Sequence, residues 1–321
     1  MHKNTKKIWL HYIIAPAALL VLLFLIYRQV TARGDIKEQW QRLQQHLNVG
    51  NIKWLVLVLL LAPANWLLES LKWQKLLSRI RPVVFKQAFK SMLSGMSFSL
   101  VTPNRVGDFA GRIIHVGQGY KIKAAFASVI GSVAQMCVTA SFGIAGLIYL
   151  NVVNGNFYTK LALGLAFVVA AGIIFLFFNI NRFKGFGKKY KQLRKLNFGL
   201  RVFSFYARKD LVYILLLALG RFLCYNLQFL LLINILGAGV PLFPGILVSA
   251  LMFWTISIIP SVAMLELGVR GFVGIYLFMD ATHLSTETLA ILSGSYLLWF
   301  LNLVVPAILG SFTLLRLKTE S

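Results

Sequence analysis

The sequence has few of the side chains that enzymes use for hydrolysis, redox chemistry or metal binding. It contains 9 acidic residues, five histidines and two cysteines among 321 residues. Cys137 and Cys224 both lie inside apolar stretches, which favours packing over a disulfide or a metal site. No histidine has Asp, Glu or Cys at a ligand-like spacing, and no Walker-type nucleotide-binding loop is present. We therefore predict no metal and no cofactor.

Charge of either sign is also scarce. Only 13% of the residues are charged, where a soluble domain has about a quarter. The chain is 58% hydrophobic with a mean hydropathy of +0.75, and several apolar runs reach the roughly 20 residues that a helix needs to cross a bilayer. These features predict an all-α polytopic membrane protein that forms a single transmembrane domain over residues 1–321.

The charge that is present is strongly unbalanced, with 33 lysines and arginines and a net charge of +24. The basic residues concentrate in a few connecting segments, chiefly between Lys72 and Lys90 and between Arg182 and Lys209. This distribution follows the positive-inside rule, which indicates cytoplasmic loops that also attract anionic lipid. We therefore predict membrane lipids with anionic head groups as partners, and no nucleic acid.

With the basic loops placed inside, the hydropathy pattern predicts a consistent path through a bacterial cytoplasmic (inner) membrane, with both termini cytoplasmic. A polar segment, 35–48, has apolar residues at helical spacing and predicts an amphipathic helix in the interface. The pattern predicts about six spanning helices, at residues 8–27, 52–71, 124–150, 160–179, 210–236 and 288–315.

Two further apolar stretches are each interrupted by a proline and resemble one another. Residues 97–112 contain Pro103 and residues 255–270 contain Pro260. After each proline an acid is followed four residues later by an arginine, so the two charges share one helix face. These i,i+4 pairs are Asp108 with Arg112 and Glu266 with Arg270.

Broken helices that carry charge, at corresponding places in two halves of an apolar chain, are typical of a transporter's binding site. We predict two re-entrant hairpins, 85–119 and 244–278, in an inverted-repeat-like arrangement with their tips near the midplane. The alternative for 244–278 is two full spans.

Arg221 lies about eleven residues into a predicted span, on the order of 16 Å deep, and needs a partner. The available acids are Asp108, Glu266 and Glu69. The arginine then either forms a structural salt bridge or lines a polar cavity. Polar amides in other spans are typical of interhelical hydrogen bonds: Gln135, Asn226, Gln228 and Asn302.

The candidate substrate-binding residues are Arg105, Arg112, Arg221 and Arg270, with Asp108 and Glu266 as charge-pairing or proton-carrying groups. Four cations against two acids leave two positive charges in excess. Because a guanidinium presents a planar fork that suits phosphate, the set predicts a site for a phosphate-bearing lipid head.

The first element, Pro103-Asn-Arg-Val-Gly-Asp-Phe-Ala-Gly-Arg112, resembles the Pro-Gly-Arg-x-Gly-Glu-x-x-Arg element of the transmembrane region of lysylphosphatidylglycerol synthases, the flippase-like domain family. The segment from Ile259 to Arg270 resembles the family's second element. Asn104 stands in place of the usual glycine and Asp108 in place of glutamate. The resemblance covers essentially the whole chain. It implies lipid flipping without the soluble domain that synthesises the aminoacylated lipid.

Three functions remain at this point. The first is translocation of an anionic lipid between leaflets, and it is not enzymatic. The second is an integral-membrane transferase or phosphatase, which would depend on Asp108 or Glu266, with His115 as a base; an interfacial role for this histidine is favoured. The third is a non-transporting scaffold, which leaves the cost of the buried charges unexplained.

Overall fold

The computed structural model describes residues 24, 27–28, 36–46, 49–102, 105–185, 201–260, 263–282 and 288–319. Within these residues the chain forms helices and turns and no β-strand. Five of the described helical segments are long and apolar enough to cross a bilayer. The chain is therefore an all-α polytopic membrane protein, as predicted. Pro103 lies outside the described residues, and so does the predicted first span, 8–27, except for residues 24 and 27.

The five long segments agree with the second to sixth predicted spans. They are α4 (Ile52–Ser78), α7 (Lys121–Asn154), α8 (Phe157–Phe178), α10 (Arg208–Ile235) and the continuous run of α13 (Thr288–Trp299), the π-helical η8 (Phe300–Val304) and α14 (Val305–Thr319). The assignment of Lys72 and Lys75 to a loop is wrong, because α4 continues to Ser78. Carboxylates at Glu69 and Asp210 pair with these two lysines, which lets the helix include them.

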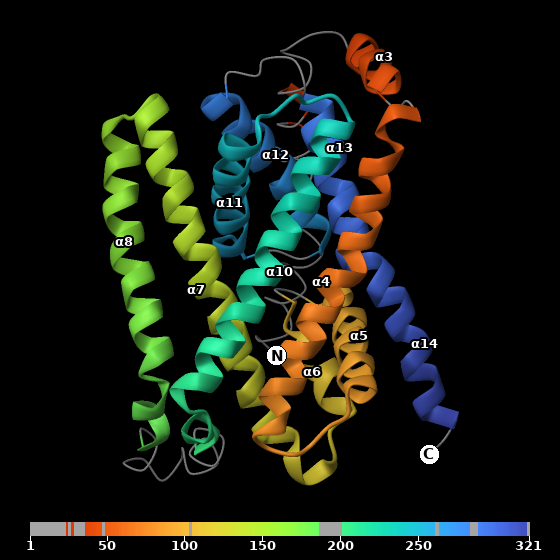
Figure 1. Cartoon of the computed structure of the whole chain (residues 1–321), viewed down its shortest axis with the longest axis vertical. Coiled ribbons are helices and arrows are strands. Elements are labelled where there is room, and N and C mark those ends of the chain that lie inside the picture. Colours follow the sequence, from red (N-terminus) through yellow and green to blue (C-terminus); the bar gives the residue numbers. More distant parts are fainter. Residues whose placement is uncertain are drawn as a thin grey trace, which may run out of the picture.

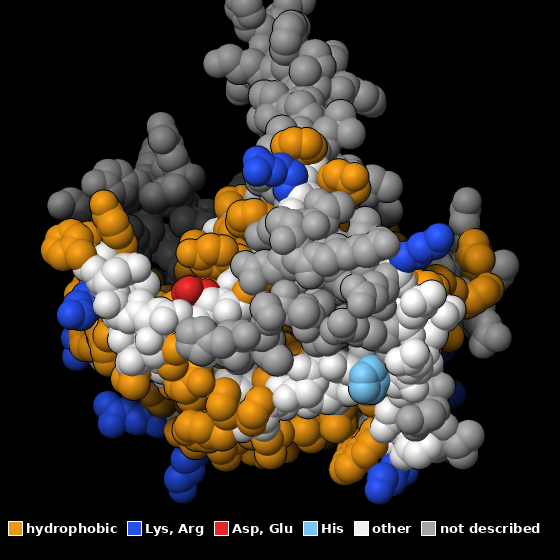
Figure 2. Space-filling model, turned by 90° about the horizontal axis from the view of Figure 1, so that it is seen from above, with side chains coloured by type: hydrophobic (Ala, Val, Ile, Leu, Met, Phe, Trp, Pro, Cys, Tyr) orange, Lys and Arg blue, Asp and Glu red, His pale blue; other side chains and the backbone are white. Residues whose placement is uncertain are grey.

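Lysines and arginines are distributed unevenly between the two ends of the bundle. One end carries α3 (Ile36–His46), the helix predicted within 35–48, together with the α7–α8 and α10–α11 connections (Figure 1). Viewed from that end, lysines and arginines lie mostly toward the rim of the part that is described, where hydrophobic side chains are also prominent (Figure 2). The opposite end holds Arg79, Lys121 and Arg208 at helix termini and Arg81 in the α4–α5 connection.

Two helical hairpins occupy opposite halves of the bundle (Figure 1). The first consists of α5 (Phe85–Val101) and α6 (Gly107–Ile114), and the second of α11 (Leu242–Ile258) and α12 (Ala263–Thr282). The connecting ends of both hairpins point toward the middle of the molecule (Figure 1). With eight residues, α6 is about 12 Å long, which is too short to cross a bilayer.

Local chemistry explains why α5 and α11, the first helix of each hairpin, end where they do. Pro260 restricts the residue before it, Ile259, to extended backbone. The helix α11 therefore ends at Ile258. In the first hairpin, the Thr102 hydroxyl donates to the Phe98 carbonyl and accepts from the Gly107 N–H at 2.7 Å. The Thr102 hydroxyl therefore caps the end of α5 and the start of α6 at the same time.

Glycines allow the hairpins to pack closely. Gly111 of α6 faces Gly95 of α5, and a Cβ added at Gly111 would lie 2.7 Å from the Gly95 Cα. Gly143 of α7 lies against Trp254 of α11 in the same way, because a Cβ added at Gly143 would lie 2.6 Å from the Trp254 Cβ. Two large apolar clusters hold the bundle together around these contacts, one about α7, α10 and α11 and the other about α4, α7 and α10. The charged groups lie among these packed helices.

The two cysteines are buried and form no disulfide. The Cys224 thiol donates to the Leu61 carbonyl, and Cys137 lies in the apolar cluster between α7 and its neighbours. Both are placed as the sequence predicts.

Candidate functional site

A buried carboxylate, Glu69 of α4, is the centre of the first ion-pair cluster. Its Oε1 lies 2.8 Å from Arg112 Nη1, and its Oε2 lies 2.7 Å from Lys72 Nζ and 3.0 Å from Arg221 Nη1. Arg112 also donates from Nε to Asp108 Oδ1 at 2.9 Å. This Glu69 cluster joins α4, α6 and α10 through one acid.

The Glu69 cluster is closed to solvent on most sides. The side chains of Glu69, Lys72 and Arg112 are 5%, 3% and 7% exposed. The Arg112 guanidinium lies 5.6 Å from the centre of the Trp73 ring, within cation–π distance. Charges buried this deeply persist only when each is paired, so the cluster fixes the first hairpin against the long helices.

A second cluster is centred on Glu266 of α12. Glu266 Oε1 accepts from Arg105 Nη2 at 2.6 Å and from Arg270 Nη2 at 2.7 Å. The Tyr225 hydroxyl of α10 accepts from Arg270 Nη1 at 3.2 Å. In contrast to the Glu69 cluster, one member is open, because the Arg105 side chain is 43% exposed.

Arg105 joins the tips of the two hairpins. It lies two residues before α6, while Glu266 lies in the first turn of α12. Both Arg105 Nη2 and Nε donate to the Glu266 carboxylate, so the pair is bidentate. Arg105 has a φ of 55°, and no other non-glycine residue in the described part of the chain has a positive φ. Non-glycine residues in this region are strained, and such strain concentrates at functional sites.

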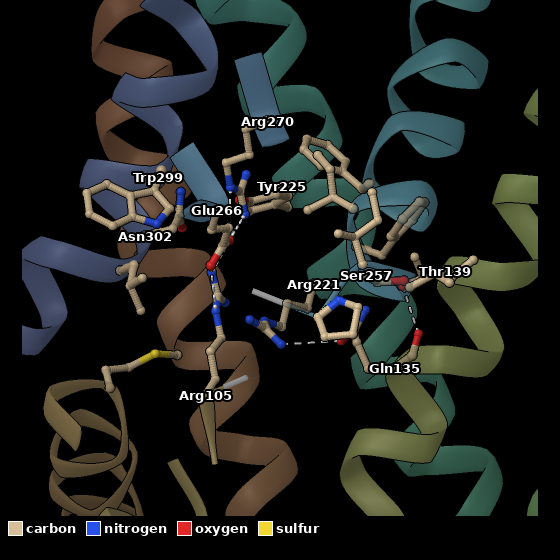
Figure 3. Close-up of a pocket in the computed structure, with 18 residues that line it drawn as sticks. Arg105, Gln135, Thr139, Arg221, Tyr225, Ser257, Glu266, Arg270, Trp299 and Asn302 are labelled. Carbon is tan, nitrogen blue, oxygen red and sulfur yellow. Dashed lines mark hydrogen bonds and ion pairs between the residues drawn. The ribbon is translucent and has the colours of Figure 1, made fainter. Parts of the chain in front are cut away.

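A cavity of about 490 Å³ lies between the hairpin tips and helices α7, α10 and η8 (Figure 3). Arg105 and Arg221 point into it from one side, and Glu266 and Arg270 lie on the other (Figure 3). The second hairpin contributes its tip, from Ser257 to Pro260. Aromatic side chains complete much of the wall: Phe222, Tyr225, Phe253 and Trp299. We call this space the central cavity.

Neutral polar groups connect the central cavity to the surrounding helices. Asn65 of α4 donates to Asn302, and Asn302 donates to Gln228 of α10 at 2.7 Å. Gln135 of α7 accepts from Arg221 at 3.4 Å. Asn226 accepts from Ser249 of α11. These contacts confirm the interhelical role that the sequence predicts for the four amides.

The structure brings only part of the predicted site to one place. Arg105, Arg221, Arg270 and Glu266 line the central cavity, and so does Pro260. Arg112 and Asp108 do not line it, although they form the expected i,i+4 pair. The second expected pair, Glu266 with Arg270, is also present.

Sequence reasoning missed the roles of Lys72 and Tyr225 and left the role of Glu69 open. Lys72 was assigned to a loop, although its i,i+3 spacing from Glu69 is a signal for a pair on one helix face. Glu69 was one of three possible partners for Arg221, and only the fold shows that it binds three cations at once. Tyr225 carries no sequence signal, because its hydroxyl meets Arg270 only through the packing of α10 on α12.

The fold and the site define a polytopic membrane protein with a charged cavity between two helical hairpins. The family model of the lysylphosphatidylglycerol synthase TM region matches residues 8–310, so the chain belongs to that family. No curated protein and no solved structure matches the chain. The membrane character and the family both point to a role connected with membrane lipids.

Proposed function

We propose that this protein moves an anionic, phosphate-bearing lipid between the two leaflets of a bacterial inner membrane, and that it does so without modifying the lipid. The head group crosses through the central cavity while the acyl chains stay in the bilayer. The observation that carries the proposal is the composition of the cavity wall. Three arginines, Arg105, Arg221 and Arg270, face one carboxylate, Glu266.

The exposure of two of these arginines supports a binding role. The side chains of Arg105 and Arg221 are 43% and 24% exposed, although both belong to ion pairs. A phosphate entering the cavity meets partly free guanidinium groups, whose planar donors suit bidentate contacts with its oxygens. Glu266 and Glu69 keep the arginines in place while the cavity is empty.

The arrangement of the hairpins supports a path through the membrane. The α5–α6 and α11–α12 hairpins occupy opposite halves of the bundle and meet at the Arg105–Glu266 pair. We propose that both are re-entrant, one from each face, because irregular backbone at mid-membrane depth is tolerated where it lines a cavity. The end that carries Arg79 and Arg81 is then cytoplasmic, together with both chain termini.

A reconstituted translocation assay tests this function. Purified protein in liposomes containing a fluorescent phosphatidylglycerol is mixed with dithionite, which quenches only the outer leaflet. We expect wild-type protein to make inner-leaflet lipid accessible, and Arg105→Gln to slow that exchange at least about tenfold because it removes a charge-assisted contact with the phosphate.

Arg79→Gln is the matched control. Arg79 is 44% exposed and lies 2.6 Å from an acid, Asp210, as Arg105 does from Glu266, but Arg79 does not line the central cavity. We expect its exchange rate to stay within about twofold of wild type, because Arg79 lies outside the cavity and Asp210 keeps Lys75 as a partner. Equal rates for wild type and Arg105→Gln, or no exchange by any variant with anionic lipids, would contradict the proposed function.

A further inference from the structure

A second cavity lies outside the central one, at the opposite end of α6. Its volume is about 550 Å³. The walls come from the α4–α5 connection, the first turns of α5, the residues after α6 and the turn η4 (Gln118–Tyr120). Four of its lining side chains are cationic: Arg81, Lys86, Lys90 and Lys121. We call it the basic pocket.

The cations of the basic pocket have no acidic partner. No carboxylate lines the pocket, and none of its four cations forms an ion pair within the part of the chain that the structure describes. Lys75 and Arg79, at the same end of the bundle, behave differently, because both pair with Asp210 at 3.0 and 2.6 Å. Membrane orientation requires positive charge on this face, but it does not require unpaired charge gathered around one hollow.

The pocket is built on a loop held by specific contacts. Gln87 donates to the His115 carbonyl at 2.8 Å, and the His115 ring lies 2.7 Å from the Ser94 hydroxyl. A Cβ added at Gly117 would lie 3.0 Å from Arg81 Nη1, so the guanidinium lies directly against the loop backbone. The glycine therefore leaves room for Arg81 at the pocket wall.

Apolar side chains belong to the same wall. Val84 and Ile114 line the pocket and are 69% and 41% exposed. A free phosphate ion gains nothing from such groups, whereas the glycerol and first acyl carbons of a lipid bury apolar surface against them. Charge and apolar surface together match a lipid phosphate better than an inorganic one.

We propose that the basic pocket is a second phosphate-binding site, which takes the head-group phosphate of a lipid in the adjacent leaflet. The role of this site rests on the proposed function, in which the basic pocket binds the lipid before its head group enters the central cavity. The eight-residue helix α6 joins the two sites, with Arg105 before its first residue and His115 after its last. The sites are thus separated by a helix of about 12 Å.

Direct lipid binding tests the pocket without any need for translocation. Purified protein in detergent is titrated with dioleoyl phosphatidylglycerol, and bound lipid is counted by native mass spectrometry. The test variant is K86Q/K90Q, which removes two exposed cations of the pocket. The control is R208Q/K209Q, which removes two exposed cations from the same end of the bundle, outside the pocket.

We expect K86Q/K90Q to lose one bound lipid, through a loss of affinity of at least about tenfold, while the control stays within about twofold of wild type. Equal losses in both double variants would show general charge attraction and overturn the site, as would no loss in either. Inorganic phosphate at millimolar concentration is expected to leave the lipid bound; its displacement of the lipid would overturn the lipid assignment. Lipid binding at the pocket without exchange in liposomes would reject the proposed function and leave the site standing.

Discussion

The two ion-pair clusters are built alike and differ in their access to water. In each, one glutamate pairs with two arginines. Glu69 binds Arg112 and Arg221, which come from two other helices. Glu266 binds Arg105 from the other hairpin and Arg270 from the next turn of its own helix. The Glu69 cluster holds its three cations around a side chain that is 5% exposed. The Glu266 cluster faces the central cavity and includes Arg105, which is 43% exposed. The two glutamates are about equally buried, at 5% and 9% exposed, so the same residue types support two roles and the exposure of one cation, Arg105, separates them.

Arg221 is the point where the two regions meet. Its Nη1 pairs with Glu69 at 3.0 Å, yet its side chain also lines the central cavity. The closed cluster thereby fixes the position of a cavity arginine. We infer that the Glu69 cluster acts mainly on stability, and the Glu266 cluster mainly on binding.

The largest effect on stability is expected from Glu69→Gln. The substitution leaves Lys72 without a counterion, and it leaves Arg221 with only the 3.4 Å contact to Gln135. Removing one partner from a buried ionic group costs about 3–5 kcal/mol. Thermal unfolding in detergent measures the loss, with the amount of monodisperse protein as a second readout.

Lys72→Met is the informative companion to that variant. It removes a buried cation while Glu69 keeps Arg112 and Arg221, so its cost should be much smaller than that of Glu69→Gln. A loss of 1 kcal/mol usually lowers the melting temperature by about 2 °C or more. If Glu69→Gln melts within about 2 °C of wild type, the Glu69 cluster is therefore not the structural centre of the fold.

A smaller effect on stability is expected from Glu266→Gln. Arg270, whose side chain is 6% exposed, keeps only the Tyr225 hydroxyl, whereas Arg105 can turn to the cavity, so the free energy of unfolding should fall by about 2–3 kcal/mol, less than for Glu69→Gln. Removal of the negative charge should also tighten the binding of phosphatidylglycerol by a few-fold, which native mass spectrometry measures.

The comparison between Glu69 and Glu266 fails if the two variants lose equal stability. The comparison is strengthened if Glu266→Gln binds lipid more tightly and releases it more slowly. The rate of lipid exchange would then fall although the affinity for lipid rises. Such a split between binding and exchange is not expected of a purely structural ion pair.

Much of the fold was predictable, because its signals are local. Apolar runs located the long helices, and Pro260 located the end of α11. The i,i+4 spacing predicted the pair of Glu266 with Arg270, since helical periodicity determines which side chains share a face. The full length of α4 was not predictable from hydropathy, because its last turns contain Lys72 and Lys75.

The candidate site was less predictable, because its decisive pairs join distant parts of the chain. Arg105 and Glu266 are 161 residues apart, and no periodicity relates them. The sequence offered three acids for Arg221, and only the packing of α10 against α4 selects Glu69. Arg112 was grouped with the binding residues by its position in the repeat, but it points to Glu69 instead of the cavity.

Chemical modification of Ser257→Cys tests the central claim, that an anionic head group enters the central cavity, most directly. Ser257 is exposed and lines the cavity, while the native Cys137 and Cys224 are buried, so the introduced thiol is the reactive one. We predict that an anionic methanethiosulfonate reacts at least about tenfold faster than a cationic one, that phosphatidylglycerol slows the reaction, and that the modified protein no longer exchanges lipid. Faster reaction with the cationic reagent, or undiminished exchange after complete modification, would contradict the account.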